Sequence, residues 1–250
     1  NGEVVVLVHG FSVPSYIWDP TFDFLTGAGY RVLRFDLYGR GLSDRPDADY
    51  TIGFFAEQLD QLVQQLGVET PFRLVGLSMG GPVTTKFTNR HPEKVRHLVL
   101  LDPLVVPPGE EDIKPLNWPL AGEYLAAVYL LPRVAAGQSS DFHDSSRFDG
   151  WESRFREQMQ YRGFRRAILS TIREFPSADV LEQYSQLGES DTPVDVFWGR
   201  EDTTVPFEHS VHLMERLPRA RLTVIDQAGH LPHYERPEIF NPLLLELFRD

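Results

Sequence analysis

Residues 72–81, FRLVGLSMGG, run without a break from an apolar segment into a serine flanked by glycines. The apolar part, Phe72–Leu77, has the composition of a strand that is buried on both faces of a sheet. A serine in so tight a turn between strand and helix is forced outward on a strained backbone, and the glycines give the room that the turn needs. Ser78 is therefore the candidate nucleophile. The alternative is an ordinary serine that caps the following helix.

Further apolar segments of similar length lie on both sides of this one. They alternate with segments whose apolar residues recur every three or four positions, as in amphipathic helices. Strands are predicted at Val4–Val8, Arg31–Phe35, Phe72–Leu77, Val95–Leu101, Val194–Trp198 and Arg221–Asp226, and helices at Trp18–Leu25, Ile52–Leu66, Pro82–Arg90, Phe207–Leu217 and Pro237–Phe248. This order predicts an α/β fold with a mostly parallel sheet flanked by helices. Its functional site is expected at the carboxyl ends of the strands.

Residues 107–187 interrupt the alternation, because they contain no convincing strand. The segment begins with several prolines and continues into helix-like sequence rich in aromatic residues and arginine. We predict a helical cap here, inserted after the strand that ends at Leu101 and placed over the strand ends. The expected domain organisation is a core formed by residues 1–106 and 188–250, with a cap formed by residues 107–187.

Composition excludes several classes of function. The 250 residues suit one domain, or one domain with a large insertion. With 24 basic and 36 acidic side chains the net charge is −12, which disfavours binding to nucleic acid. The absence of cysteine excludes disulfides, a thiolate nucleophile and cysteine-ligated metals. The longest apolar stretch, Leu125–Leu131, is far shorter than the roughly 20 residues that cross a bilayer, so we expect no integral membrane contact.

A serine hydroxyl needs a base within hydrogen-bond reach before it can act as a nucleophile near neutral pH. His230 follows the last predicted strand, so its loop is expected at the same edge of the sheet as Ser78. His233 is the alternative base, or a residue that braces this loop, and His9 is expected to position the loop after the first strand. The His230/His233 pair lacks the spacing of a zinc motif, and we expect neither a metal nor a cofactor.

The base in turn needs a carboxylate on its other ring nitrogen. Asp202 lies just past the fifth predicted strand and is the predicted acid, whereas the adjacent Glu201 would point elsewhere in a tight turn. Asp102, directly after the fourth strand, is the competing candidate, with hydrogen bonding to the backbone as its other possible role. The backbone N–H groups of Phe11 and Met79 are the predicted donors to an oxyanion.

These motifs resemble the α/β-hydrolase fold family, in the serine-nucleophile branch related to bacterial carboxylesterases, haloperoxidase-like enzymes and carbon–carbon bond hydrolases. The resemblance covers nearly the whole chain outside the cap. It rests on five motifs in the family's order, namely His9-Gly10-Phe11, residues 36–43, Gly76–Gly81, Gly199–Asp202 and Gly229-His230. The family usually begins with two further strands, an antiparallel pair, before the strand that carries His-Gly. This chain starts at that strand, so either it has been trimmed, which we expect, or the fold lacks the two strands and exposes an edge of the sheet. Separately, we expect the protein to be cytoplasmic.

The resemblance implies a serine hydrolase that cleaves carboxylic esters of small to medium acyl groups through an acyl-enzyme. Ser78 would attack, His230 would act as base and Asp202 would orient it. Serine rather than aspartate at the turn argues against the family's dehalogenases and epoxide hydrolases. The alternatives are a carbon–carbon bond hydrolase, a menaquinone-pathway-type synthase or a cofactor-free perhydrolase on the same residues. A binding protein that kept the scaffold without the chemistry is a further one.

The cap contains a basic stretch in an otherwise acidic chain. Residues 147–173 hold seven arginines and three acidic residues, a net charge of +4. Two interpretations fit this stretch. It is either a lid that attracts anionic substrates, or a solvated helix surface on which arginine pairs with glutamate at a few tenths of a kcal/mol per pair.

Overall fold

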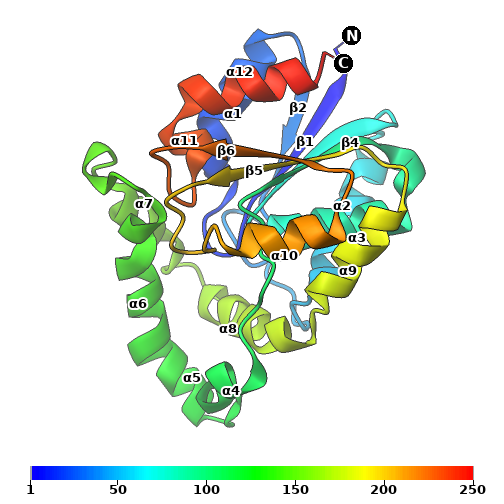
Figure 1. The fold of residues 1–250 in the computed structure, drawn as a ribbon. Helices are drawn as coiled ribbons and strands as arrows, with labels where there is room; N and C mark the ends of the chain where they lie inside the picture. Colours follow the sequence, from blue (N-terminus) through cyan, green and yellow to red (C-terminus); the bar gives the residue numbers. More distant parts are fainter. Residues whose placement is uncertain (1, 250) are drawn as a thin grey trace.

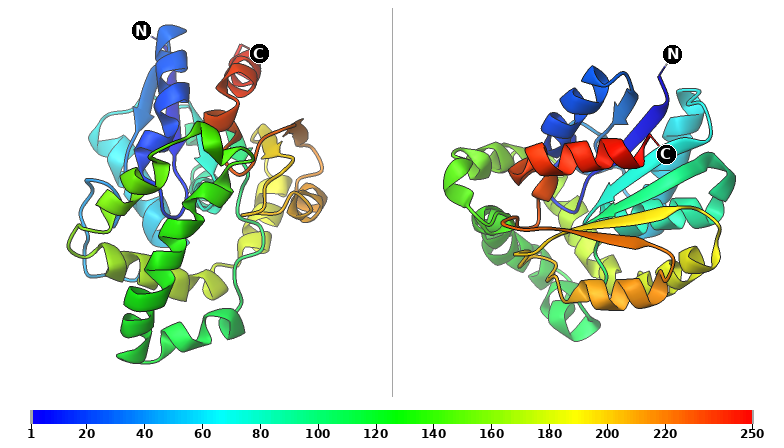
Figure 2. Two further views of the ribbon diagram at one scale, coloured as in Figure 1. Left: turned by 90° about the vertical axis from the view of Figure 1, so that its left-hand side faces the viewer. Right: turned by 45° about the horizontal axis from the view of Figure 1, so that its top comes forward.

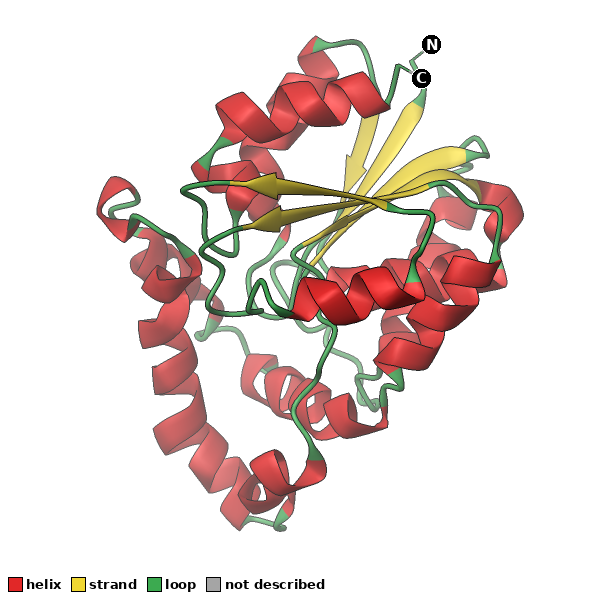
Figure 3. Cartoon of the chain, in the orientation of Figure 1, coloured by secondary structure: helices red, strands yellow, loops and turns green. Residues whose placement is uncertain are grey.

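The computed structural model describes residues 2–249, and its central element is a sheet of parallel strands (Figure 3). The strands are β1 (Val4–Val8), β2 (Arg31–Arg34), β3 (Phe72–Leu77), β4 (Val95–Leu101), β5 (Val194–Gly199) and β6 (Arg221–Ile225). Their order across the sheet is β2-β1-β3-β4-β5-β6. The predicted α/β fold is confirmed, with strand ends within two residues of the predicted ones. The central strands β1 and β3 are buried along their whole length, which explains their uninterrupted hydrophobicity.

The strand order reverses next to β1. The chain first adds β2 on one side of β1, then crosses to the other side and adds β3 to β6 in succession. In open α/β sheets the ligand crevice lies at such a switch point, outside the carboxyl ends of the strands. Val8 of β1 pairs with Gly76 of β3, so the loops that follow these two strands emerge side by side. The switch point therefore brings the loop carrying His9 next to the turn carrying Ser78.

Helices cover both faces of the sheet (Figures 1 and 2). One face carries α1 (Asp19–Gly27), α11 (Pro232–Glu235) and α12 (Pro237–Leu247), and the other carries α2 (Ile52–Gln65), α3 (Gly80–Arg90), α9 (Val180–Glu189) and α10 (His209–Arg216). Helix α2 begins where the Thr51 hydroxyl accepts the N–H of Phe54, and it buries the apolar positions that its spacing predicts. Each of the long core helices thus has one buried face against the sheet.

Residues 107–187 form no strand, and most of their helices lie beyond the carboxyl ends of the strands (Figure 1). These are α4 (Glu110–Ile113), α5 (Ala121–Leu125), α6 (Leu131–Ala136), α7 (Trp151–Gln158) and α8 (Phe164–Glu174). Residue 187 lies inside α9, which packs against α3 and α10 of the core. We therefore propose that the cap comprises α4 to α8 and ends before α9. No helix within residues 2–249 is both long and apolar enough to cross a membrane.

Gly80, the first residue of α3, tests how closely this helix must approach β1. A Cβ at this position would lie 2.6 Å from the carbonyl oxygen of Val8 and 2.8 Å from that of His9. We expect Gly80→Ala to lower the free energy of unfolding by about 2 kcal/mol, because backbone would have to move. In the control Gly27→Ala the new methyl group meets nothing within 4 Å, so stability should stay the same or rise slightly. Urea denaturation measures both, and a Gly80→Ala protein as stable as the wild type would contradict the close approach.

Candidate active site

Ser78 occupies the turn between β3 and α3 in a strained backbone conformation. Its φ of 54° lies in the left-handed region, which costs a non-glycine residue on the order of 1 kcal/mol. Three backbone hydrogen bonds hold the turn: the Ser78 N–H donates to Leu101 at 2.9 Å, and its carbonyl accepts from Gly81 at 2.8 Å and Leu104 at 3.0 Å. A Cβ on Gly76 would lie 2.5 Å from the Gly80 carbonyl, so the preceding glycine is needed for space. The turn is thus fixed by its neighbours on β4 and α3.

A cavity of about 240 Å³ lies over this turn, and both Ser78 and His230 line it. Its walls come from the loop after β1, from the turn itself and from residues 134–141 of the cap. The apolar part of the lining is formed by Phe11, Val13, Ile17, Leu77, Val134 and Leu231. The predicted nucleophile and the predicted base therefore share one largely apolar cavity at the carboxyl ends of the strands.

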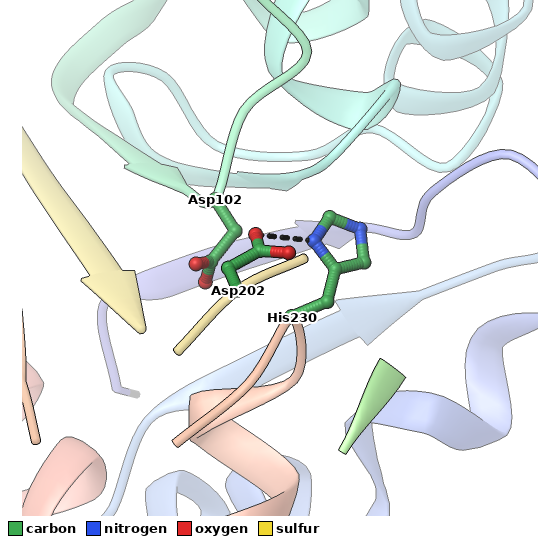
Figure 4. Close-up of side chains that lie close together, drawn as sticks. All are labelled: Asp102, Asp202 and His230. Carbon is green, nitrogen blue, oxygen red and sulfur yellow. Dashed lines mark hydrogen bonds and ion pairs between the residues drawn. The ribbon is translucent and has the colours of Figure 1, made fainter. Parts of the chain in front are cut away.

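Asp202 and His230 form a buried hydrogen-bonded pair (Figure 4). His230 Nδ1 lies 2.7 Å from Asp202 Oδ2, and the other carboxyl oxygen accepts the N–H groups of Thr204 at 2.8 Å and Val205 at 2.9 Å. These donors fix the orientation of the carboxylate, which in turn fixes the imidazole ring. With Nδ1 engaged in this way, Nε2 is the nitrogen left to exchange a proton.

The pKa of His230 reflects two opposing influences. Burial disfavours the imidazolium form, but the charge and hydrogen bond of Asp202, with a contribution from Asp141, outweigh it and raise the pKa above 6.5. Asp141 lines the same cavity, and its backbone carbonyl accepts the N–H of His230 at 2.7 Å. The cap residue Asp141 therefore acts on the histidine through both its main chain and its charge.

The competing acids occupy other positions. Glu201 Oε2 accepts the N–H of Ala228, two residues before His230, at 3.0 Å. Asp102 lies beside Asp202, but its Oδ1 accepts the N–H of Gly199 at 2.7 Å. Oδ1 of each of the two aspartates thus already accepts backbone N–H groups. Oxygens that are hydrogen-bonded in this way suit proton exchange better than cation binding, although atoms of the two carboxyls and of His230 lie within 4.8 Å of one another.

The two other histidines singled out in the sequence are buried and hold loops. His233 faces the carbonyl of Ile17 through Nε2 at 3.1 Å, and burial lowers its pKa to about 3. His9 accepts the N–H of Leu37 at Nε2, so its Nδ1 carries the proton and donates to the Gly10 carbonyl at 2.8 Å. Burial lowers the pKa of His9 to about 4. Both therefore stay neutral near pH 7 and connect neighbouring loops.

The predicted oxyanion donors flank Ser78. A Cβ on Gly10 would lie 3.0 Å from the Ser78 Cβ, so the backbone leading to Phe11 runs close beside the nucleophile, and Met79 follows it directly. Arg40, which is fully buried, holds the loop by donating from Nε to the Phe11 carbonyl at 2.8 Å. The sequence analysis missed this function of Arg40. Its position within the loop of residues 36–43 was the available signal.

Glu235 is a second functional residue that the sequence analysis missed. It is 1% exposed, and its carboxylate accepts three backbone N–H groups: those of Gly229 at 2.9 Å, His143 at 3.0 Å and Asp144 at 2.7 Å. Gly229 immediately precedes His230, whereas the other two donors belong to the cap. One carboxylate therefore joins the histidine loop to the cap. In the sequence, the only indication of this role was the position of Glu235 two residues after His233.

The arginines of residues 147–173 do not line the described cavity. Four of them pair with acidic residues at the surface, where ion pairs contribute roughly 0 to 1 kcal/mol each. The pairs are Arg154 with Asp19, Arg156 with Glu152, Arg166 with Asp47 and Arg173 with Glu123. The structure thus favours the solvated surface over the anion-attracting lid.

The comparisons with known proteins agree with this geometry. The family model of the α/β-hydrolase fold matches residues 3–237, so the chain belongs to that family. It is 28% identical over 257 residues to the 2-hydroxy-6-oxononadienedioate/2-hydroxy-6-oxononatrienedioate hydrolase of Escherichia coli K12, covering 97% of this chain and 86% of that protein.

Two solved structures extend the comparison. A thermophilic esterase from Thermogutta terrifontis has a TM-score of 0.82 at 25% identity, covering 100% of this chain and 90% of that one. The 2-hydroxy-6-oxo-6-phenylhexa-2,4-dienoate hydrolase from Rhodococcus sp. strain RHA1 has a TM-score of 0.81 at 28% identity, covering 100% of this chain and 91% of that one. Proteins similar to this chain therefore include both an esterase and hydrolases of dienoates.

The raised pKa of His230 predicts the pH dependence of catalysis. The base must be neutral to accept a proton, so kcat/KM should rise with pH through an apparent pKa above 6.5 and level off beyond it. In Asp202→Asn the carboxylate that is hydrogen-bonded to Nδ1 is lost, so the pKa of His230 should fall and the remaining activity should titrate at a lower pH. Initial rates between pH 5 and pH 9, about two units either side of neutral, measure both curves. A wild-type transition below 6.5 would contradict the dominance of Asp202 over burial.

Proposed function

We propose that the protein is a serine hydrolase that cleaves small, uncharged carboxylic esters through an acyl-enzyme. The observation that carries the proposal is the shared cavity. A serine on a strained turn and a histidine bonded to a buried carboxylate face the same apolar space. This is the arrangement in which a hydroxyl becomes a nucleophile, since the base, its orienting acid and the binding space coincide.

Each of these residues has its own role in the proposed reaction. Ser78 Oγ attacks the ester carbonyl while His230 Nε2 takes its proton, and Asp202 stabilises the resulting imidazolium. The oxyanion accepts the N–H groups of Phe11 and Met79. His230 then returns the proton to the departing alcohol, which leaves an acyl group on Ser78. A water molecule, deprotonated by His230, attacks that acyl group, and collapse of the intermediate restores the hydroxyl and releases the acid.

The cavity lining supports an uncharged substrate. Within the described lining there is no lysine or arginine, and the ionisable side chains are Asp141 and His230. Burial raises the pKa of Asp141, which accepts the Thr204 hydroxyl at 2.7 Å. A substrate carboxylate would lose its hydration here without gaining a cation. The volume of about 240 Å³ lies below the roughly 300–1,000 Å³ of common ligand sites, which favours small substrates.

A carbon–carbon bond hydrolase is the second candidate, and the identity to the Escherichia coli hydrolase favours it. The substrate in that relative's name is a dioate, a compound with two carboxylates. The cavity offers no cationic side chain among the residues that line it, which is why we place ester hydrolysis first. A synthase or a perhydrolase on the same residues would share the chemistry at Ser78 and differ in products.

Replacing the nucleophile tests the proposed reaction. Ser78→Ala should lower kcat for p-nitrophenyl butyrate by about 10³-fold or more, and should abolish labelling by a fluorophosphonate probe. Ser177→Ala is the control, because this exposed serine follows α8 and its hydroxyl donates to the Glu174 carbonyl. It should keep wild-type activity and labelling. Full ester hydrolysis by Ser78→Ala would refute the mechanism, and a wild type that reacts with neither reagent would favour a binding protein.

A pair of esters tests the charge preference. p-Nitrophenyl butyrate and the p-nitrophenyl monoester of succinic acid both carry four-carbon acyl groups, but the second ends in a carboxylate. We expect kcat/KM to favour the butyrate by about tenfold or more, because like charges placed together are strongly unfavourable. In Asp141→Asn the ratio of kcat/KM for the butyrate to kcat/KM for the succinate monoester should be smaller, because the acidic side chain of the cavity is gone. Faster hydrolysis of the succinate monoester would instead point to carboxylate-bearing substrates.

A further inference from the structure

Asp102 is a fully buried carboxyl group that the proposed reaction does not use. It is the first residue after β4, with a φ of 41° in the left-handed region. Its N–H donates to Phe197 at 3.0 Å and its Oδ1 accepts the N–H of Gly199 at 2.7 Å, so both ends of the residue are tied to β5. These bonds direct the side chain toward the turn that follows β5, where Asp202 lies (Figure 4).

The second carboxyl oxygen of Asp102 lacks a partner. Oδ2 is buried and accepts no hydrogen bond from any described residue. Buried polar atoms are nearly always hydrogen-bonded, so an orphaned oxygen needs an explanation. Asp202 lies alongside, and oxygens of both carboxyls and a ring nitrogen of His230 fall within 4.8 Å of one another. An ionised Asp102 would place two negative charges together without a cation between them.

The surroundings decide which carboxyl holds the charge. Asp202 accepts two N–H groups and faces His230, whereas Asp102 accepts one N–H. Burial, and then the negative charge of Asp202, raises the pKa of Asp102 well above its usual range. Two carboxyls that share a site cannot both ionise readily. The proton therefore belongs on Asp102, and the orphaned Oδ2 is the atom left to carry it.

We propose that Asp102 is a positioning residue of the active site, a neutral acid whose proton on Oδ2 is directed at Asp202, so that the two carboxyls carry one negative charge between them. This inference rests on the proposed function of His230 as the base. The hydrogen bond from Asp102 adds a restraint on Asp202 to those from the N–H groups of Thr204 and Val205. Because the charge is shared, it moves to Asp102 when Asp202 cannot ionise.

The first experiment compares Asp102→Asn with Asp102→Ala. An amide can accept the Gly199 N–H and donate to Asp202, as a neutral acid does. We expect Asp102→Asn to keep most of kcat/KM and an unshifted His230 pKa. Asp102→Ala loses both bonds, and its kcat/KM should fall by about tenfold or more. A fall in the His230 pKa of about one unit or more in Asp102→Asn would show that Asp102 is charged in the wild type, and would overturn the proposal.

The pKa of His230 is measured by NMR titration of protein labelled with ¹⁵N-histidine, with the resonance assigned from its absence in His230→Gln. The groups that act on this histidine are Asp202 and Asp141, and those that act on Asp102 are Asp202 and the Gly199 N–H. Asp195→Asn is the matched control. Asp195 lies on β5 and pairs with His97 at 2.8 Å, so its replacement should leave the His230 titration unchanged.

The second experiment places Asp102→Asn in an Asp202→Asn background. In the single variant Asp202→Asn the charge can move to Asp102, so the imidazole keeps a carboxylate nearby. The double variant has none, and its kcat/KM should be lower by a further factor of about ten or more, with a lower His230 pKa. Equal values in the single and double variants would overturn the shared charge. The titration needs no substrate, so a protein that cleaves no ester but titrates as expected would refute only the proposed function.

Discussion

The contact between the end of β1 and the start of α3 is the constraint on which the rest of the site depends. Gly80 lets the helix begin against the carbonyls of Val8 and His9, and Gly10 lets the loop after β1 run beside Ser78. Ser78, whose backbone is strained, lies beside Gly10 and two residues before Gly80. The close packing of these backbones thus helps to position the predicted nucleophile and the predicted oxyanion donors, together with the hydrogen bonds of the turn.

Four acids, three of them buried and Asp141 partly buried, are the second organising feature. Asp102, Asp202, Asp141 and Glu235 lie around the histidine loop, and each binds backbone N–H groups or a hydroxyl rather than a lysine or arginine. A buried carboxylate is tolerated when hydrogen-bond donors replace its hydration. The site thus uses main-chain dipoles where a surface would use ion pairs.

The sequence was sufficient to predict the strands and the turn at Ser78, because continuous hydrophobicity and glycine spacing are local signals. The sequence was also sufficient to predict that Ser78, Asp202 and His230 lie at the same edge of the sheet, since each follows a predicted strand and the carboxyl ends of parallel strands meet at one edge. The sequence did not predict the hydrogen bonds that Arg40 and Glu235 make to the backbone. Nor did it decide whether the arginines of residues 147–173 lie at the surface or over the cavity. Both depend on contacts between segments far apart in the chain, which no local pattern encodes. The cap limit at residue 187 stays a prediction, and our proposal that the cap ends before α9 rests on the packing of that helix against α3 and α10.

The carboxylate of Glu235 has a mechanical consequence for the cap. Because it binds Gly229 together with His143 and Asp144, the cap residues after position 141 cannot lift away without pulling on the peptide next to His230. The other end of the cap is tied differently, because Arg173 of α8 pairs with Glu123 of α5 and donates to the Leu116 carbonyl at 2.8 Å. The position of the histidine loop is therefore coupled to residues 143 and 144 of the cap rather than to α4 and α5.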